Sequence, residues 1–105
     1  NFEVVKTYEI VTFKLKPETL EEVYIAETKK LERNFLGKLH GFVDRQTGVS
    51  DDGVWTVVLH WETPGDAQSS IDKFVNSDET KAFTDLIDMD TFVMNRYALK
   101  DSYSL

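Results

Sequence analysis

The chain has 105 residues, enough for one hydrophobic core and too few for two ordinary domains, so we expect a single domain over residues 1–105. Its 12 Lys and Arg stand against 19 Asp and Glu, and the net charge of -7 without a basic cluster argues against nucleic acid as a partner. The absence of cysteine excludes thiolate chemistry, disulfides and cysteine-based zinc sites.

No stretch approaches the roughly 20 consecutive apolar residues that a membrane helix requires, so we expect no membrane partner. The 105 residues contain no basic and then apolar leader, so the cytoplasm is expected rather than export, while a secretion signal upstream of Asn1 stays open as an alternative. Apolar residues make up 41% and charged residues 30% of the chain, which is typical of a folded globular protein.

Residues 4–15 are expected to form the first strand, because β-branched and aromatic residues roughly alternate there. The alternation puts one set of side chains on a single face: Val5, Thr7, Glu9, Val11, Phe13 and Leu15. A helix is expected from Pro17, since a proline followed by acidic residues is typical of a helix N-terminus. The apolar stripe of this helix consists of Leu20, Val23, Tyr24, Leu31 and Phe35. Gly37 is expected to end the helix in a left-handed conformation.

Two further strands, Phe42–Val49 and Val54–Trp61, are separated by the turn cluster Ser50–Gly53 and predict a β-hairpin. An even loop would place His60 opposite Val43. The second of these strands is apolar on both faces, which indicates a sheet that is covered on both sides.

A second helix is expected from Pro64, with Asp66 in its first turn and a core stripe ending at Phe74. Ser77 and Asp78 predict a second cap, so this helix should break and restart. The restarted helix has an expected stripe of Ala82, Phe83 and Leu86, and the last strand is expected over Thr91–Leu99.

The order strand, helix, strand, strand, helix, strand predicts an α+β fold of the ferredoxin-like βαββαβ type, an antiparallel sheet with its helices on one face. The other face then lacks a cover of its own. We therefore expect a homodimer whose interface is the sheet face that carries Thr56, Val58 and His60.

Residues 41–86 carry a family resemblance. Gly41 and Phe42 open the second strand, Trp61 ends the third, and Ser77-Asp78 is followed by Lys81-Ala82-Phe83. With these features the sequence resembles the antibiotic biosynthesis monooxygenase-like family of dimeric α/β barrels. The resemblance implies two sheets packed face to face, but the fold hosts oxygenases, haem-degrading enzymes, isomerases, decarboxylases and ligand-binding modules.

The haem-degrading branch of that family implies an Asn on the first strand, a Trp on the third and a His in the second helix. Only Trp61 matches, because Val11 and Thr84 stand near the other two positions. We therefore expect no haem and no other cofactor. A metal site is not expected either, since the hairpin places His40 and His60 on opposite faces.

Glu27 and His60 are the candidate catalytic residues. The helical angle of Glu27 falls inside the apolar stripe, where a carboxylate could stay protonated or act as a base. Alternatively, Glu27 lies at the stripe edge and its carboxylate reaches water or Arg96. His60 could act as a neutral acid or base in the dimer interior, or it could be a hydrogen-bonded interface residue. Glu9 shares a face with Val11 and could join Glu27.

A ligand pocket is expected between the helices and the sheet. Its candidate ligand-binding residues share inward-facing positions or a charge on the inner strands: Glu9, Val11, Tyr24, Trp61, Phe74, Phe83 and Arg96. Such a pocket is mostly apolar, with few polar groups, as small-molecule sites generally are.

Two functions are consistent with this pocket. One is an enzyme resembling cofactor-independent monooxygenases that acts on an apolar, oxygen-bearing substrate. The other is a noncatalytic binding module for a hydrophobic or acyl ligand.

Overall fold

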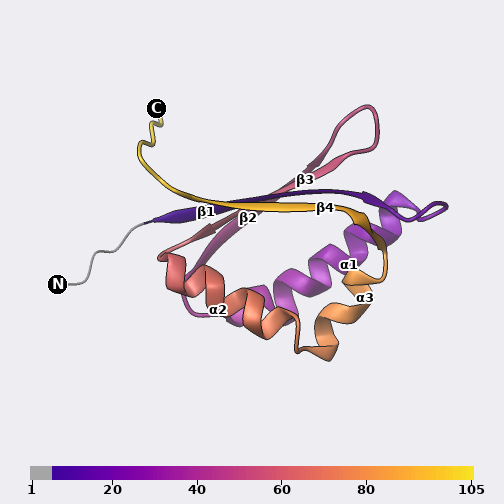
Figure 1. Cartoon of the computed structure of the whole chain (residues 1–105), viewed down its shortest axis with the longest axis horizontal. Coiled ribbons are helices and arrows are strands. Elements are labelled where there is room, and N and C mark those ends of the chain that lie inside the picture. Colours follow the sequence, from indigo (N-terminus) through magenta and orange to yellow (C-terminus); the bar gives the residue numbers. More distant parts are fainter. Residues whose placement is uncertain (1–5) are drawn as a thin grey trace.

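The computed structural model describes residues 6–105, which form one layer of sheet and one layer of helices (Figure 1). In chain order the elements are β1 (Thr7–Leu15), α1 (Glu21–Asn34), η1 (Leu36–Lys38), β2 (Phe42–Val49), β3 (Trp55–Trp61), α2 (Pro64–Phe74), η2 (Asp78–Thr80), α3 (Lys81–Thr84) and β4 (Ile87–Ala98). The four strands form one antiparallel sheet in the order β2-β3-β1-β4. The helices lie on the same face of this sheet, so the predicted ferredoxin-like α+β fold is confirmed. Among the described helices, none has the length and hydropathy needed to cross a membrane.

Strand β1 alternates as its sequence predicts. Thr7, Glu9, Val11 and Phe13 are buried on the face toward the helices, while the intervening residues are less buried. The predicted start of this strand at residues 4 and 5 lies outside the described residues. Because β1 is a central strand, its inner face forms the floor of the space under the helices.

Helix α1 begins at Glu21, and the predicted start at Pro17 is wrong. Lys16 to Thr19 form a turn in which the N–H of Thr19 donates to the carbonyl of Lys16 at 3.2 Å. Pro17 and Glu18 occupy the centre of this turn, and Glu18 has a φ of 68°, which no helical residue adopts. The proline therefore initiates a turn that precedes the helix.

The end of α1 also differs from the prediction. Gly37 lies in η1 and does not have the left-handed conformation expected of a helix-ending glycine. A Cβ atom at this position would lie 2.8 Å from the backbone oxygen of Glu32. Gly37 therefore allows two backbone segments to approach closely, while the helix itself ends at Asn34.

The second helical region breaks as predicted. Thr63 caps α2 by accepting a hydrogen bond from the N–H of Asp66, and Pro64 occupies the first turn. Ser77 caps η2 by accepting from the N–H of Glu79, and α3 follows. In α3 the predicted stripe is only partly right, because Phe83 is buried whereas Ala82 is exposed.

The hairpin of β2 and β3 has a different register from the one predicted. Phe42 pairs with Trp61, but the register then shifts, so that Asp44 rather than Val43 lies opposite His60. An irregularity at Val43 inserts one residue into β2, and beyond it every side chain of β2 changes face relative to the prediction. As a result, Arg45 lies opposite Leu59 on the inner face of the sheet.

The core lies between the sheet and the helices and is rich in aromatic residues. Its largest fully buried side chains are those of Trp61, Tyr24, Phe13 and Ile87. The rings of Tyr24 and Trp55 pack with centroids 4.5 Å apart. The opposite face of the sheet, with Val58 and His60, has no helix against it in the described chain (Figure 1).

Candidate functional site

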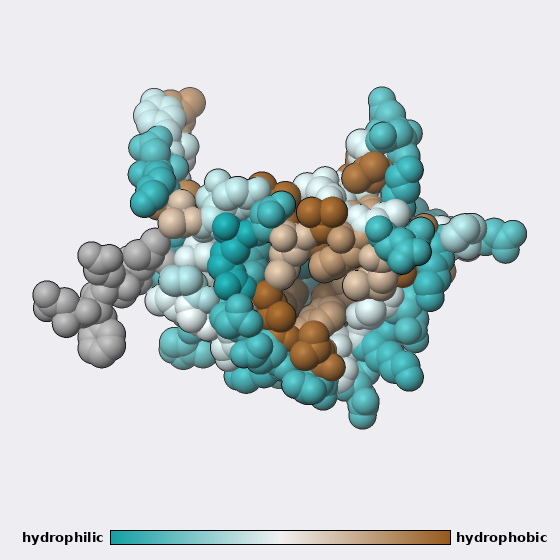
Figure 2. Space-filling model, in the orientation of Figure 1, coloured by the Kyte–Doolittle hydropathy of each residue, from teal (hydrophilic) through white to brown (hydrophobic). Residues whose placement is uncertain are grey.

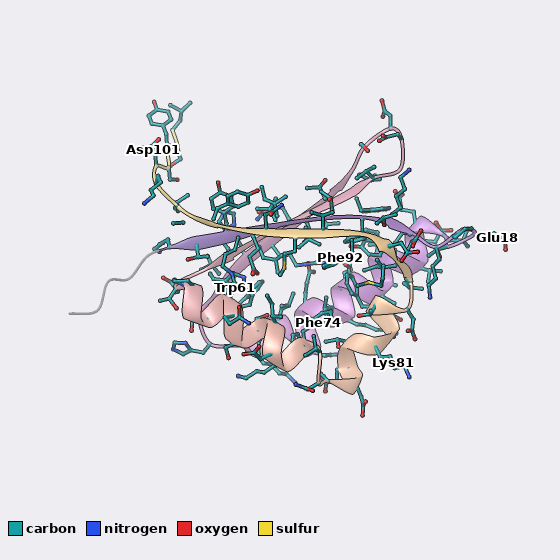
Figure 3. All side chains as sticks on the ribbon, viewed as in Figure 1. Glu18, Trp61, Phe74, Lys81, Phe92 and Asp101 are labelled. Carbon is teal, nitrogen blue, oxygen red and sulfur yellow. The ribbon has the colours of Figure 1, made fainter. Side chains whose placement is uncertain are left out.

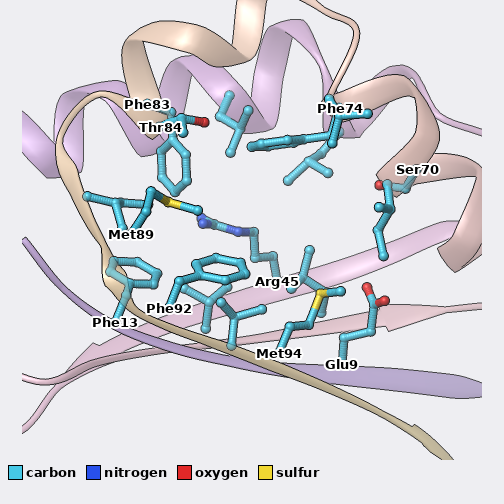
Figure 4. A pocket seen from close by; sticks show the side chains of 18 residues that line it. Glu9, Phe13, Arg45, Ser70, Phe74, Phe83, Thr84, Met89, Phe92 and Met94 are labelled. Carbon is cyan, nitrogen blue, oxygen red and sulfur yellow. The ribbon is translucent and has the colours of Figure 1, made fainter.

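A cavity of about 230 Å³ lies between the inner face of the sheet and the helices (Figure 4). Eighteen residues line it, and most of them are apolar. Phe92 from β4 and Phe74 from α2 lie in the layer between sheet and helices, on opposite walls of this space (Figure 3). Figure 2 shows apolar side chains gathered around a hollow in the face of the molecule toward the viewer. The cavity therefore has an apolar mouth as well as an apolar lining.

An irregular segment of β4 builds one wall of the cavity. Thr12 pairs with Val93 and Lys14 with Asp88, so residues 89–92 bulge out of the ladder. The hydroxyl of Thr91 accepts a hydrogen bond from the N–H of Lys14 at 2.8 Å and holds the bulge to β1. Bulges redirect side chains near functional sites. Here the bulged segment supplies Met89 and Phe92 to the cavity wall.

Glu9 provides a carboxylate at the cavity wall. Nε1 of Trp61 donates a hydrogen bond to Oε1 of Glu9 at 2.9 Å, and Nε of Arg96 donates to Oε2 at 3.0 Å. The carboxylate is buried, so the ion pair with Arg96 compensates a charge that would otherwise be costly. Glu9 is thus fixed in one orientation at the edge of an apolar space.

Arg45 is the second charged residue of the lining. Its Nη1 atom donates to the hydroxyl of Thr28 at 3.2 Å and to the carboxylate of Glu32 at 3.1 Å, both on α1. Its guanidinium carbon lies 5.7 Å from the centre of the Phe83 ring, which is a cation–π distance. Only 3% of the Arg45 side chain is exposed to solvent. The cavity therefore presents a buried cation as well as a carboxylate.

The predicted ligand-binding residues divide into two groups. The cavity wall includes Glu9, Val11, Phe74 and Phe83. The remaining three residues, Tyr24, Trp61 and Arg96, lie outside the lining. Trp61 and Arg96 each donate a hydrogen bond to Glu9 and thus hold this residue of the wall in place. Tyr24 is fully buried in the core, and its hydroxyl has no hydrogen-bond partner in the described chain.

The inward position predicted for Glu27 is wrong. Glu27 is not part of the cavity lining, and its carboxylate pairs with Nζ of Lys30 at 3.3 Å, with 23% of its side chain exposed. The buried stripe of α1 consists of Tyr24, Thr28 and Leu31. Glu27 lies at the edge of this stripe, so the alternative of an edge acid describes its position better than that of a base in the pocket.

His60 lies on the open face of the sheet, as its alternation with Trp61 predicts. Its Nδ1 atom is 2.6 Å from Oδ1 of Asp44, and its ring centroid is 5.9 Å from that of Tyr8. The sheet lies between His60 and the cavity. Within one subunit, His60 therefore cannot contact a substrate that is bound at Glu9. Among the described residues, no group of three or more His, Asp or Glu side chains is placed to hold a metal ion.

The sequence suggested that Arg45 could pair with an interface acid or hold a substrate oxygen, but the predicted pocket lining did not include Arg45 or the β4 residues Met89, Phe92 and Met94. For Arg45 the sequence gives no signal, because an irregularity of one residue in the hairpin register moves it from the open face to the inner face. For β4 the signal was the recurrence of large apolar residues before and after Thr91, which suggests that the strand begins earlier than residue 91.

No protein-family model matches the sequence, and no curated protein matches it significantly. Solved structures do match the fold. SnoaB, a cofactor-independent oxygenase from Streptomyces nogalater, is 11% identical, with 93% of this chain and 96% of that chain covered and a TM-score of 0.73. A candidate antibiotic biosynthesis monooxygenase from Bordetella bronchiseptica is 14% identical, with 91% and 98% covered and a TM-score of 0.75.

A conserved protein from Methanosarcina mazei Go1 is 20% identical, with 92% of this chain and 95% of that chain covered and a TM-score of 0.69. At such identities the similarity concerns the fold and leaves substrate and activity open. It extends over nearly the whole chain in each comparison. The chain therefore has the ferredoxin-like fold of antibiotic biosynthesis monooxygenase-like proteins.

Proposed function

We propose that this protein is a small-molecule enzyme of the cofactor-independent monooxygenase type, acting on an apolar substrate that bears an oxygen function. The observation that carries this proposal is the fixed carboxylate of Glu9 at the wall of an otherwise apolar cavity. An apolar cavity with a few oriented polar groups is the usual form of a small-molecule site. The fold shared with SnoaB, a cofactor-independent oxygenase, supports the type of reaction.

In this proposal Glu9 is the general base. Each of its oxygens accepts one hydrogen bond from the protein, and a carboxylate has about four lone-pair sites, so further sites are available to a substrate proton. Glu9 removes a proton from a hydroxyl group or an activated carbon of the substrate. The ion pair with Arg96 and the bond from Trp61 hold the base in place, which reduces the reorganisation needed during proton transfer.

Dioxygen is the oxidant in the following step. The electron pair left on the substrate carbon reduces dioxygen and forms a C–O bond, and protonation of the distal oxygen gives a hydroperoxide. Loss of water from this hydroperoxide leaves a carbonyl group. Two hydrogens thus leave the carbon, one oxygen atom enters the substrate, and the other leaves as water. An apolar cavity suits these reaction steps because it keeps bulk water from protonating the carbanion.

The test is oxygen consumption with a panel of polyphenols and activated ketones. A substrate should be oxidised in the absence of any added cofactor, and Glu9→Gln should lower its turnover at least about a hundredfold while binding is retained. Glu62→Gln is the matched control, because Glu62 pairs with Lys6 on the surface and is not part of the cavity lining. Full turnover in Glu9→Gln would contradict a role of Glu9 as base.

A second candidate function is a noncatalytic binding module for a hydrophobic or acyl ligand. The observation that favours it is that both carboxylate oxygens of Glu9 already accept hydrogen bonds, as expected of a structural group. Mass spectrometry of the extracted native protein separates the two functions. A stoichiometric apolar molecule that copurifies unchanged, without oxygen consumption for any panel member, would support the binding module.

We also propose that the protein acts as a homodimer through the open face of the sheet. Tyr8 and Tyr97 stack there with ring centroids 5.1 Å apart, and Val58 and His60 extend the same face. Aromatic and β-branched side chains on a face that no helix covers favour burial against a second sheet. The partner that fits this face is a second copy of the chain, as the two-sheet arrangement implied by the sequence resemblance suggests.

A further inference from the structure

Arg45 is an unusual residue for the wall of an apolar cavity. It lies on β2 opposite Leu59, and its side chain runs under α1 with only 3% of its area exposed. Burial of a cation is costly unless hydrogen bonds and an opposite charge compensate it. A buried arginine at this position is therefore well suited to bind a ligand group.

The guanidinium group is only partly satisfied by the protein. Two hydrogen bonds, to Thr28 and Glu32, both originate from Nη1. A guanidinium has five N–H donors, so Nε and Nη2 carry the others. Within residues 6–105, neither of these nitrogen atoms donates a hydrogen bond to a protein group. Arg45 thus has free donors, and its side chain lines the cavity.

The charge of Arg45 is also only partly neutralised. Its carboxylate partner, Glu32, has 36% of its side chain exposed, so water solvates Glu32 and weakens the attraction between the pair. The other charged residue of the lining is Glu9, whose negative charge is compensated by Arg96. In Figure 4 the guanidinium of Arg45 extends toward Phe83 and Met89, whereas Glu9 lies near Met94 at the other end. The buried cation therefore lies at one end of the cavity and the buried carboxylate at the other.

We propose that Arg45 selects ligands whose oxygen function is anionic, a carboxylate or an ionised hydroxyl group attached to an apolar body. This inference rests on the proposed function, because it names the chemical class that the same cavity accepts. The planar fork of a guanidinium matches two oxygen atoms of such a group. The guanidinium carbon lies within cation–π distance of the Phe83 ring, and the apolar walls bind the body of the ligand.

The experiment compares 2-naphthoate with 2-naphthamide, which has nearly the same shape but no charge. Isothermal titration calorimetry at pH 7 should show that 2-naphthoate binds at least about tenfold more tightly, as expected for a hydrogen-bonded charge pair. Arg45→Met should abolish this preference and leave the affinity for 2-naphthamide within about twofold. Arg33→Met is the matched control, because Arg33 is exposed in the last turn of α1, and it should retain the preference.

Glu32→Gln provides a second variant that keeps Arg45 and is independent of whether Arg45→Met folds. It removes the neutralising carboxylate, so it should widen the preference for 2-naphthoate, and a narrower preference would contradict the proposal. Equal affinity of the wild-type protein for both probes would overturn the role of Arg45 and leave the apolar pocket supported. If neither probe binds, the cavity is not a binding site for such ligands. The inference about Arg45 is then wrong as well.

Discussion

The indole N–H of Trp61 donates to Oε1 of Glu9 across 2.9 Å, from a position diagonally across the ladder between β3 and β1. Hydrogen bonds to charged groups contribute about 1.5–3 kcal/mol to stability. Trp61→Phe should therefore lower the free energy of unfolding by at least that amount. In a double-mutant cycle with Glu9→Gln, we expect a coupling energy of about 1 kcal/mol or more, measured by urea unfolding.

Trp55→Phe is the control for this cycle. Trp55 is also buried, but it packs against Tyr24 and makes no hydrogen bond to Glu9. Its coupling to Glu9→Gln should stay within about 0.5 kcal/mol. Equal coupling for both tryptophans would show that the cycle measures general core disruption and not the Trp61–Glu9 bond.

Asp66 should make the stability of the protein dependent on pH in the acid range. The hydrogen bond with His40 and then the one with Thr63 lower the pKa of Asp66 below its ordinary value. A lowered pKa in the folded state means that the carboxylate stabilises the fold fully above the unfolded-state pKa of about 3.9. This contribution is then lost as the pH falls through the lower, folded-state pKa.

Asp66→Asn should therefore lower the free energy of unfolding by about 1 kcal/mol at pH 7, the usual effect of losing a helix-capping interaction. The difference from the wild type should shrink as the pH falls below about 4. Denaturant titrations at several pH values measure this, with Asp101→Asn in the exposed C-terminal tail as the control. A difference that stays constant down to pH 2 would contradict the assignment.

If the protein is the proposed homodimer, light scattering should give a molecular mass of about 24 kDa, twice the 12.1 kDa of the chain. Val58→Glu should convert the dimer into a monomer, since it would bury an unpaired charge at a cost of several kcal/mol. Val23→Glu introduces the same change on the exposed side of α1, where Val23 is 43% exposed, and should leave the dimer intact. A wild-type mass near that of one chain at micromolar concentration would rule out the proposed interface.

Gly41 should be intolerant of a side chain for two reasons. Its φ is 80°, and a Cβ atom would lie 2.0 Å from Oδ2 of Asp66. Gly53 has a similar φ of 81°, but nothing lies within 4 Å of its Cβ position. Gly53→Ala should therefore cost about 1–2 kcal/mol from backbone strain alone. Gly41→Ala should cost clearly more, as measured by thermal or urea unfolding, and equal costs would show that Asp66 moves away freely.

Much of the fold could be predicted because local patterns determine it. The alternation of β1 correctly placed Glu9, Val11 and Phe13 on one buried face. Ser77 was predicted to cap the restarted helix, and it caps η2. Each of these features depends on residues close to one another in the sequence, so no knowledge of tertiary contacts was needed.

The predictions about the site that were wrong depend on the register of a strand or on the apolar face of a helix. One residue is enough to change either of them. The extra residue at Val43 moves Arg45 to the inner face, and nothing in the turn sequence reveals this irregularity. Leu20 was counted as part of the apolar stripe of α1, but it is the N-cap and is 58% exposed. Without Leu20 the stripe rotates toward Thr28, and Glu27 moves to its edge.

Irregular pairing affects both edge strands of the sheet. The ladder of β2 shifts at Val43, and that of β4 shifts over residues 89–92. An edge strand offers unpaired N–H and C=O groups to which a foreign strand can add, and a bulge shortens the straight segment available for such addition. The same irregularities that place Arg45 and Phe92 at the cavity therefore also limit strand-by-strand polymerisation of the folded protein in concentrated solution.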